Sequence, residues 1–398
     1  MMLRCLAIFA CLSPLAWALD QQSIGDQITR ALYQSPERVD DPILLGAASR
    51  LLRPIHQASD WRDQPLRLVI LRNDQLNAFA APGGVMGLHT GLFNEAESAD
   101  QVASVIAHEV AHLTQRHFIR RQDSQSKVQA AYLVGTLAAL AAGFSGDPTL
   151  GTAAMSATQA AAIDQTLAFS REHEREADRV GLQLMSDAGY ATDGMAAMFD
   201  RMQAAQQLAG QPLPYLSTHP LSTDRIADTR ARARTDRDNI AVSDQEFRLW
   251  QAVGTGAGLN TLPLADIGRI GYQMQAWTWL QQDKTAEALD VIEQGQLSFP
   301  RDYALLIFKA QALAATQPEA ALDLYAQAGE LHPYFAQPYL DAESLARSLG
   351  WTAEFYYYGA WAAERSGQPA KAQRQWQRVS EMDSALAIKA RGYLKPEN

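Results

Sequence analysis

The segment VASVIAHEVAHL, residues 102–113, decides the fold, because it sets His108-Glu109-Val110-Ala111-His112 inside an apolar run with helical spacing. Residues four apart share one face of a helix, so both imidazoles can bind a single Zn²⁺. Glu109 is next to the first histidine and could act as a general base on water at the metal. The motif also requires a helix and a third ligand around it.

The segment SREHEREAD, residues 170–178, offers that third ligand. Glu174 and Asp178 lie four residues apart, and two histidines plus one glutamate would leave a fourth zinc position for water. Asp178 could hold a ligand imidazole through its free N–H, or donate a proton during bond breakage. On spacing alone other side chains compete for these roles: Glu172, His173 and Glu176. The competing structural interpretation is a charged, solvated helix face.

His219 precedes Pro220, and a residue before proline is disfavoured in a helix, so we expect it in a loop. If this loop folds over the cleft, His219 could take the open zinc position and make the site latent. A loop hydrogen bond or transition-state stabilisation are the alternatives. Arg225 could pair with a site carboxylate or bind substrate. Four further histidines are interpreted as structural or surface residues: His56, His89, His117 and His332.

Around the motif, apolar spacing predicts helices from Ser23 to Tyr33, from Pro42 to Ile55 and from Ala96 to about His117. Strands are predicted at 66–72, 76–81 and 85–90, the last two separated by the turn residues Pro82-Gly83-Gly84. From the motif onward the pattern is mostly helical. A small sheet followed by helices indicates an α+β arrangement.

The 398 residues carry 34 Lys and Arg against 44 Asp and Glu, and a net charge of −10 argues against nucleic-acid binding. The first residues resemble a signal peptide, with Arg4, an apolar stretch from Leu6 to Leu15 and a cleavage site after Ala18. A membrane anchor or a lipoprotein signal are the alternatives. Cleavage would remove Cys5 and Cys11, so the exported form would have no thiol chemistry.

The rest of the chain divides at a predicted linker, residues 236–263, which is charged at first and then rich in glycine. Beyond it, Ala288, Ile292 and Pro300 recur 33 residues later as Ala321, Tyr325 and Pro333, which is typical of tetratricopeptide helix pairs. An ordinary helical bundle is the alternative. The uncharged run 128–144 is interpreted as a buried or lid helix, with peripheral membrane contact or a membrane span as alternatives.

Together, HEVAH, SREHEREAD, NAFAAPGGVMGLHTGLF at 77–93 and THPLSTDRIAD at 218–228 resemble the M48 family of zinc metallopeptidases. The resemblance implies a gluzincin-like fold with one Zn²⁺ per chain, Glu109 as catalytic base and Asp178 as proton donor or positioning group. It implies three zinc ligands: His108, His112 and Glu174. The GGVMG strand would be an edge strand that an extended substrate joins through main-chain hydrogen bonds.

We therefore predict an α+β chain with a signal peptide at 1–18, a zinc protease domain at 19–250 and an all-α tetratricopeptide solenoid at 264–398. The resemblance implies a periplasmic endopeptidase that cleaves unfolded or misassembled outer-membrane β-barrel proteins and contacts the barrel assembly machinery. The alternative is mainly a chaperone or scaffold whose zinc site is latent or structural. No sequence feature by itself identifies the partner.

Overall fold

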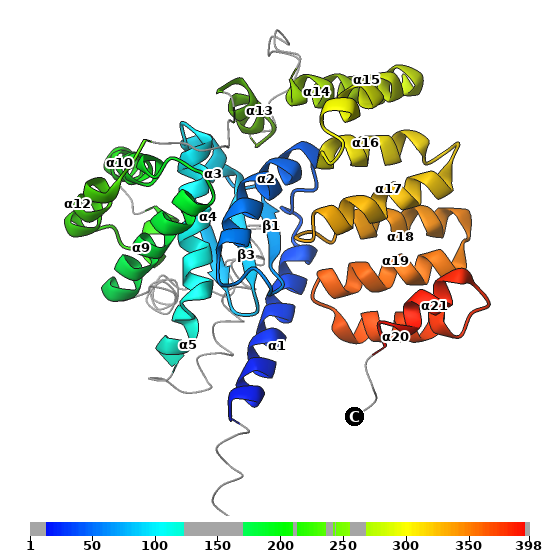
Figure 1. The fold of residues 1–398 in the computed structure, drawn as a ribbon, viewed down its shortest axis with the longest axis horizontal. Coiled ribbons are helices and arrows are strands. Elements are labelled where there is room, and N and C mark those ends of the chain that lie inside the picture. Colours follow the sequence, from blue (N-terminus) through cyan, green and yellow to red (C-terminus); the bar gives the residue numbers. More distant parts are fainter. Residues whose placement is uncertain are drawn as a thin grey trace, which may run out of the picture.

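The computed structural model is mostly helical with one three-stranded sheet (Figure 1). It describes residues 13–122, 170–209, 213–235, 242, 244–254 and 268–394. The predicted buried or lid helix at 128–144 lies outside these residues. Of the helices described, none is both long enough and apolar enough to span a bilayer.

The first two helices are α1 (Ser13–Gln34) and α2 (Pro42–Ala58), which confirms the helices predicted at 23–33 and 42–55. The carboxylate of Asp41 caps α2 by accepting hydrogen bonds from the N–H groups of Ile43 and Leu44, at 2.9 and 3.0 Å. Helix α1 runs across the predicted cleavage site after Ala18. Cleavage there stays a prediction.

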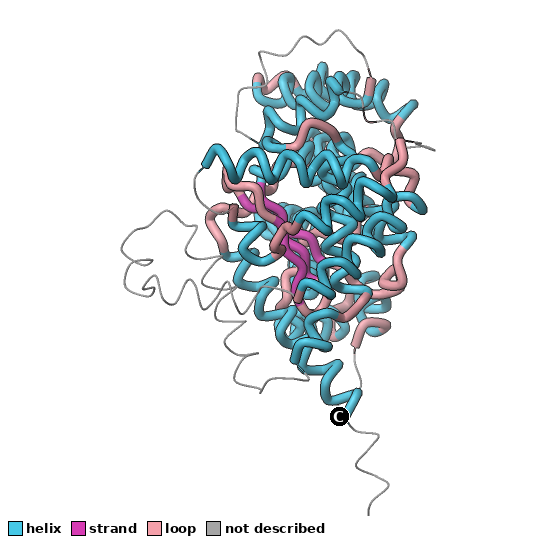
Figure 2. Tube along the Cα trace, turned by 90° about the vertical axis from the view of Figure 1, so that its left-hand side faces the viewer, coloured by secondary structure: helices cyan, strands magenta, loops and turns pink. Residues whose placement is uncertain are grey.

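The sheet consists of β1 (Arg67–Leu71), β2 (Ala78–Ala81) and β3 (Val85–His89), in the order β1-β3-β2. Strand β3 pairs in parallel with β1 and antiparallel with β2. Figure 2 shows the three strands running side by side, with helices packed around them. All three strand predictions are confirmed.

The prediction that the GGVMG strand is an edge strand is wrong, because β3 is the central strand. Every residue of β3 is buried, and apolar strands cover both of its sides. The outer side of β1 is closed as well, since Val39 N–H donates to Ile70 (2.9 Å) and Leu68 N–H donates to the carbonyl of Tyr334 (2.9 Å). Among the described residues, β2 is the strand paired on one side alone.

Eight helices of the described chain surround or follow this sheet: α3 (Thr90–Glu95), α4 (Ala99–Thr114), α5 (His117–Gln122), α9 (Arg171–Asp187), α10 (Asp193–Ala209), α11 (Pro214–Thr218), α12 (Thr223–Arg232) and α13 (Asp244–Gly254). Helix α4 is central and packs against α2, α9, α10 and β2. The predicted helix at 96–117 is confirmed, although it ends at Thr114, shortly before Arg116 takes a φ of 51°.

The predicted linker at 236–263 contains a helix, which the sequence analysis did not anticipate. Helix α13 carries Phe247 and Trp250, both buried at 3% and 2% exposure, so these aromatic side chains anchor it to the core. The charged start and the later glycines of this segment suggested a linker, whereas burial of two large rings stabilises the helix.

The C-terminal region is all-helical, in eight helices: α14 (Arg269–Gln281), α15 (Thr285–Ser298), α16 (Tyr303–Leu313), α17 (Pro318–Leu331), α18 (Gln337–Leu349), α19 (Thr352–Arg365), α20 (Pro369–Ser380) and α21 (Ala385–Arg391). Successive helices contact one another and form a stack at one side of the sheet (Figure 1). Ala288 and Ala321, which recur at the predicted spacing, are fully buried. The tetratricopeptide assignment stays a prediction.

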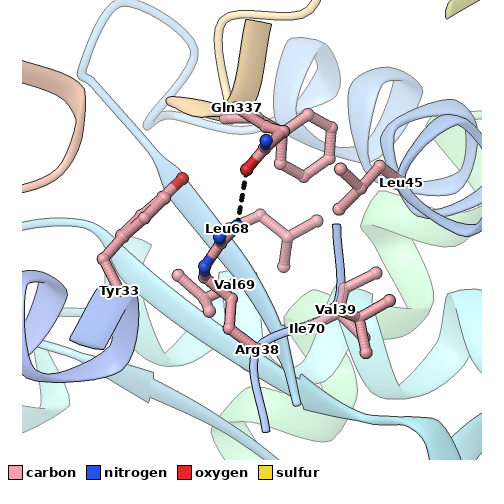
Figure 3. Close-up of a pocket in the computed structure, with 9 residues that line it drawn as sticks. Tyr33, Arg38, Val39, Leu45, Leu68, Val69, Ile70 and Gln337 are labelled. Atoms are coloured by element: carbon pink, nitrogen blue, oxygen red, sulfur yellow. Dashed lines mark hydrogen bonds between the residues drawn. The ribbon is translucent and has the colours of Figure 1, made fainter. Parts of the chain in front are cut away.

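One hydrophobic core joins the sheet, its helices and the C-terminal stack. At the junction, Tyr33 Oη accepts from the N–H of Ala336 at 2.7 Å, and Arg38 donates to Gln337 at 2.6 Å. Figure 3 shows these side chains around a pocket that is floored by Leu68, Val69 and Ile70 of β1. The stack is therefore fixed to the edge of the sheet that lies away from β2.

Replacing Phe335, a 1% exposed ring that also lines this pocket, tests the shared core. Phe335→Ala should lower the free energy of unfolding by about 3–5 kcal/mol, because it leaves a cavity between the two parts. Leu297→Ala is the control, at a site 86% exposed, and should change stability by less than about 0.5 kcal/mol. If denaturant titrations showed equal losses of unfolding free energy for the two variants, the shared core would be contradicted.

Candidate metal centre

Helix α4 places the two histidines of the sequence motif. Ser98 caps this helix by accepting the N–H of Gln101 at 3.3 Å, and almost every following residue is buried. His108 and His112 point their Nε2 atoms at each other, 3.0 Å apart, and are 2% and 0% exposed. The four-residue spacing thus brings the nitrogen atoms together, as predicted.

Helix α9 brings the carboxylates to the histidines. Gly181 lies so near to α4 that a Cβ there would meet the backbone nitrogen of His108 at 3.3 Å, which lets the two helices approach closely. An oxygen of Glu174 lies 3.4 Å from Nε2 of His108, and the other lies 3.4 Å from Nε2 of His112. Asp178 Oδ1 lies 3.0 Å from Nδ1 of His108, on the opposite side of that ring.

His219 lies in the same cluster, at the end of α11. Its Nδ1 is 3.1 Å from Glu174 and 3.4 Å from Nε2 of His108. Tyr215 holds its ring by stacking, with centroids 4.6 Å apart, and its carbonyl accepts the N–H of His219. Tyr215 was not predicted from the sequence, although its place four residues before His219 on a short helix was a usable signal.

Glu109 lies beside the cluster and is 0% exposed. Neither of its carboxylate oxygens accepts a hydrogen bond from a described residue, and the nearest ionisable partner is His219, with Nε2 at 3.4 Å. A buried carboxylate without a hydrogen bond is costly. A carboxylate in this state could accept a proton from a group that enters the cluster.

Arg225, on α12, pairs with the site carboxylates, which settles the alternative left open by the sequence. Its Nε and Nη2 donate to Asp178 at 2.6 and 2.7 Å, and Nη1 lies 2.8 Å from Glu174. Nη1 also donates to the carbonyl of Pro220, next to His219. One guanidinium therefore holds α9 and the His219 loop together.

The electrostatics of the cluster favour a positive charge at its centre. Burial alone would lower the pKa of His108, but its interactions with Asp178 and Glu174 outweigh burial and raise that pKa to about 9. Burial alone would raise the pKa of Asp178, yet the hydrogen bonds from Arg225 lower it. Burial alone would likewise raise the pKa of Glu174, but its interactions with His219, His108 and His112 hold that pKa well below its usual value.

The donor set fits a zinc ion. One ligand atom from each of four buried residues lies within 4.8 Å of the other three: His108, His112, Glu174 and His219. Imidazole nitrogen and carboxylate oxygen are ligands that zinc prefers in four-coordinate sites. Three carboxylates (Glu109, Glu174, Asp178) and one guanidinium (Arg225) are buried here, a formal charge of −2 that a dication would balance.

A second layer of side chains lies behind His112. Its Nδ1 is 3.0 Å from Nδ1 of His117, whose Nε2 is 3.1 Å from Glu176. His173 stacks on His117 with centroids 4.4 Å apart. On spacing alone Glu176 and His173 compete as ligands, and His117 is interpreted as structural or surface. In the structure these three lie next to the cluster rather than in it. Glu172 is exposed.

The three other histidines interpreted as structural or surface residues are buried and lie outside the cluster: His56, His89 and His332. His56 contacts Tyr334 Oη at 3.2 Å, and His332 contacts Ser49 at 2.8 Å. The structural interpretation is therefore confirmed for these residues, and none is at the surface.

Removing the charge of Arg225 should destabilise the protein strongly. Arg225→Met would leave Asp178 and Glu174 buried without their cation, which costs about 3–5 kcal/mol. Arg230→Met is the matched control, since Arg230 pairs with Asp200 at the surface and should cost less than about 1 kcal/mol. Denaturant unfolding in the presence of a chelator measures the free energy of unfolding of both variants. Similar losses for Arg225→Met and Arg230→Met would contradict the importance of the buried network.

Comparison with known proteins places this site in a family. Residues 47–233 match peptidase family M48. The beta-barrel assembly-enhancing protease of Escherichia coli is 32% identical over 295 residues, which cover 69% of this chain and 60% of that protein. Its counterpart in Yersinia pestis is 30% identical over 58% of this chain and 47% of that protein.

A third relative is the mitochondrial metalloendopeptidase OMA1 of Schizosaccharomyces pombe, 33% identical over 45% of this chain and half of that protein. The chain thus spans less than two thirds of the length of these relatives. The matches and the His-Glu cluster agree with the metallopeptidase and the zinc cofactor predicted from the sequence. Residues 47–233 are a zinc metallopeptidase domain of the M48 family.

Proposed function

We propose that the whole protein is a periplasmic zinc endopeptidase that acts on unfolded or misassembled outer-membrane β-barrel proteins and supports outer-membrane assembly. The observation that carries the proposal is Glu109, a buried carboxylate that accepts no hydrogen bond from the described chain and faces a His, His, Glu cluster. A purely structural zinc site has no use for such a base. The client class rests on the names of the relatives, which include β-barrel assembly.

In this proposal, His108, His112 and Glu174 hold the zinc. A zinc ion held there would supply Lewis-acid polarisation of the peptide carbonyl and a lower pKa for the attacking water. Glu109 accepts the proton of the attacking water and then passes it to the leaving amine as the C–N bond breaks. We assign Asp178 to positioning His108, because a carboxylate paired with Arg225 and with a lowered pKa is a poor proton donor.

An extended client segment would add to β2. This strand packs against α4, and among the described residues its second side has no strand partner. The edge of β1 is closed by Val39 and Tyr334, so β2 is the side left for main-chain pairing. An unpaired strand of an incompletely assembled β-barrel protein has free backbone N–H and C=O groups that could pair with β2.

We further propose that the C-terminal helices are a tetratricopeptide solenoid that binds clients or the barrel assembly machinery, with a signal peptide directing export. The recurring buried alanines Ala288 and Ala321 support this assignment, as do the paired helices. The alternative function, a chaperone with a latent or structural zinc site, shares this region and differs in the role of Glu109.

Replacing Glu109 separates the two functions. Glu109→Gln should lower the rate of casein cleavage by about 10²–10⁴-fold, because the general base is lost, while zinc stays near one per chain. Glu97→Gln, an exposed glutamate just before α4, is the control and should cleave as the wild type does. Unchanged cleavage in Glu109→Gln would exclude Glu109 as the general base, whereas no cleavage by the wild type or by either variant would favour the chaperone.

His219 is proposed as a latch that takes the fourth zinc position. If the latched state holds about nine-tenths of the molecules, His219→Ala should raise casein cleavage roughly tenfold by leaving the position to water. His89→Ala, a buried histidine outside the cluster, serves as the control. Slower cleavage by a fully zinc-loaded His219→Ala variant would mean that His219 assists the reaction instead of closing the site.

A further inference from the structure

We propose that His117 is a positioning residue for the zinc site, which fixes the tautomer and ring orientation of His112 through a hydrogen-bonded chain that ends on Glu176. The inference rests on the proposed function only in taking His112 as a zinc ligand. It assigns a role to a histidine that lies outside the HEVAH motif.

The contacts form a continuous line from the cluster to the surface. His112 Nδ1 and His117 Nδ1 are 3.0 Å apart, and His117 Nε2 is 3.1 Å from Glu176 Oε2. That same oxygen accepts from Arg120 at 2.6 Å. His112 and His117 are both 0% exposed, whereas the Glu176 side chain is 27% exposed. The carboxylate charge therefore sits at the outer end of the line.

The positions of the protons follow from the chemistry of neutral imidazole, which has one N–H and one bare nitrogen. His112 Nε2 faces the cluster, 3.0 Å from His108 and 3.4 Å from Glu174, so a bound metal requires this nitrogen to be bare. The proton of His112 is then on Nδ1. His117 Nδ1 must accept it, because two N–H groups cannot face each other at 3.0 Å. His117 therefore carries its own proton on Nε2, which donates to the carboxylate of Glu176.

The backbone is shaped to make this contact. Residues five apart on one helix do not share a face, so His117 would point away from His112 if α4 continued. Arg116 instead takes a φ of 51°, in the left-handed region that a non-glycine residue enters at a cost. The turn returns the His117 ring to the ring of His112, with centroids 4.9 Å apart.

The two zinc histidines are consequently held in different ways. Nδ1 of His108 faces the carboxylate of Asp178 directly, whereas Nδ1 of His112 faces a neutral imidazole with the carboxylate one residue further out. Partners of this kind orient metal ligands, and their loss typically costs 10–100-fold in metal affinity. The arrangement orients His112 without adding another carboxylate to the buried cluster.

Two substitutions of similar polarity separate positioning from packing. In asparagine the polar atom is bonded to Cγ, as Nδ1 is in histidine, so His117→Asn keeps an acceptor for His112. In glutamine it lies one bond further out, so His117→Gln loses that acceptor although it fills more space. His56→Gln is the matched control, a buried histidine that bonds to Tyr334 and the carbonyl of Trp61 outside the site.

The experiment measures zinc affinity of the full chain by chelator competition, after circular dichroism has confirmed the fold of each variant. We expect His117→Gln to bind zinc about 10–100-fold more weakly than the wild type, with His117→Asn and His56→Gln within about threefold of it. Equal affinity of His117→Gln and wild type, or a weaker His117→Asn than His117→Gln, would overturn the proposal.

A measurement on the wild-type protein tests the proposed proton positions even if the variants fail to fold. Two-bond ¹H–¹⁵N spectra of zinc-loaded protein, labelled at histidine, should assign His117 a proton on Nε2 and a bare Nδ1. A proton on Nδ1 of His117 would overturn the inference. Zinc binding without casein cleavage would count against the proposed function alone, whereas a wild type that takes up no zinc would overturn both.

Discussion

The close packing of α9 against α4 is the constraint on which the rest of the structure depends. It confines two imidazoles and three carboxylates in a space removed from solvent, where unbalanced charge is costly. Arg225 on α12 balances part of that charge and, through Pro220, ties down the loop that carries His219. The negative charge that remains favours binding of a cation in the cluster. Arg225 therefore contributes both to the charge balance around the metal and to the position of the His219 loop.

The open edge of β1 explains why the C-terminal helices lie where they do. The backbone groups at the outer edge of β1 need hydrogen-bond partners, and the carbonyl of Tyr334 in the helical stack accepts one of these bonds. The stack therefore closes the edge away from the metal centre and leaves β2, beside α4, as the strand to which we propose a client adds. Because one core extends through both parts, the stack lies at a fixed distance from Glu109.

Much of this could be predicted from the sequence because the signals were local. Helical spacing placed His108 and His112 together, and it put Glu174 and Asp178 on one face of α9. Strand order could not be predicted, since β3 and β2 have similar apolar patterns and only pairing with β1 makes β3 central.

His117 was interpreted only as a structural or surface residue, because its contact with His112 depends on the left-handed turn at Arg116, which no spacing rule reports. Tyr215 was missed although it lies four residues before His219, on which it stacks. The partner of Arg225 was undecidable from the sequence as well, because its carboxylates come from a helix 47 residues earlier in the chain.

The most direct test of the account is X-ray absorption at the zinc edge of the purified full chain. It predicts one four-coordinate zinc with nitrogen and oxygen ligands at about 2.0–2.1 Å and the multiple scattering of three imidazoles, from His108, His112 and His219, beside one carboxylate. A chain without stoichiometric zinc, or a zinc bound by fewer than three imidazoles, would contradict it.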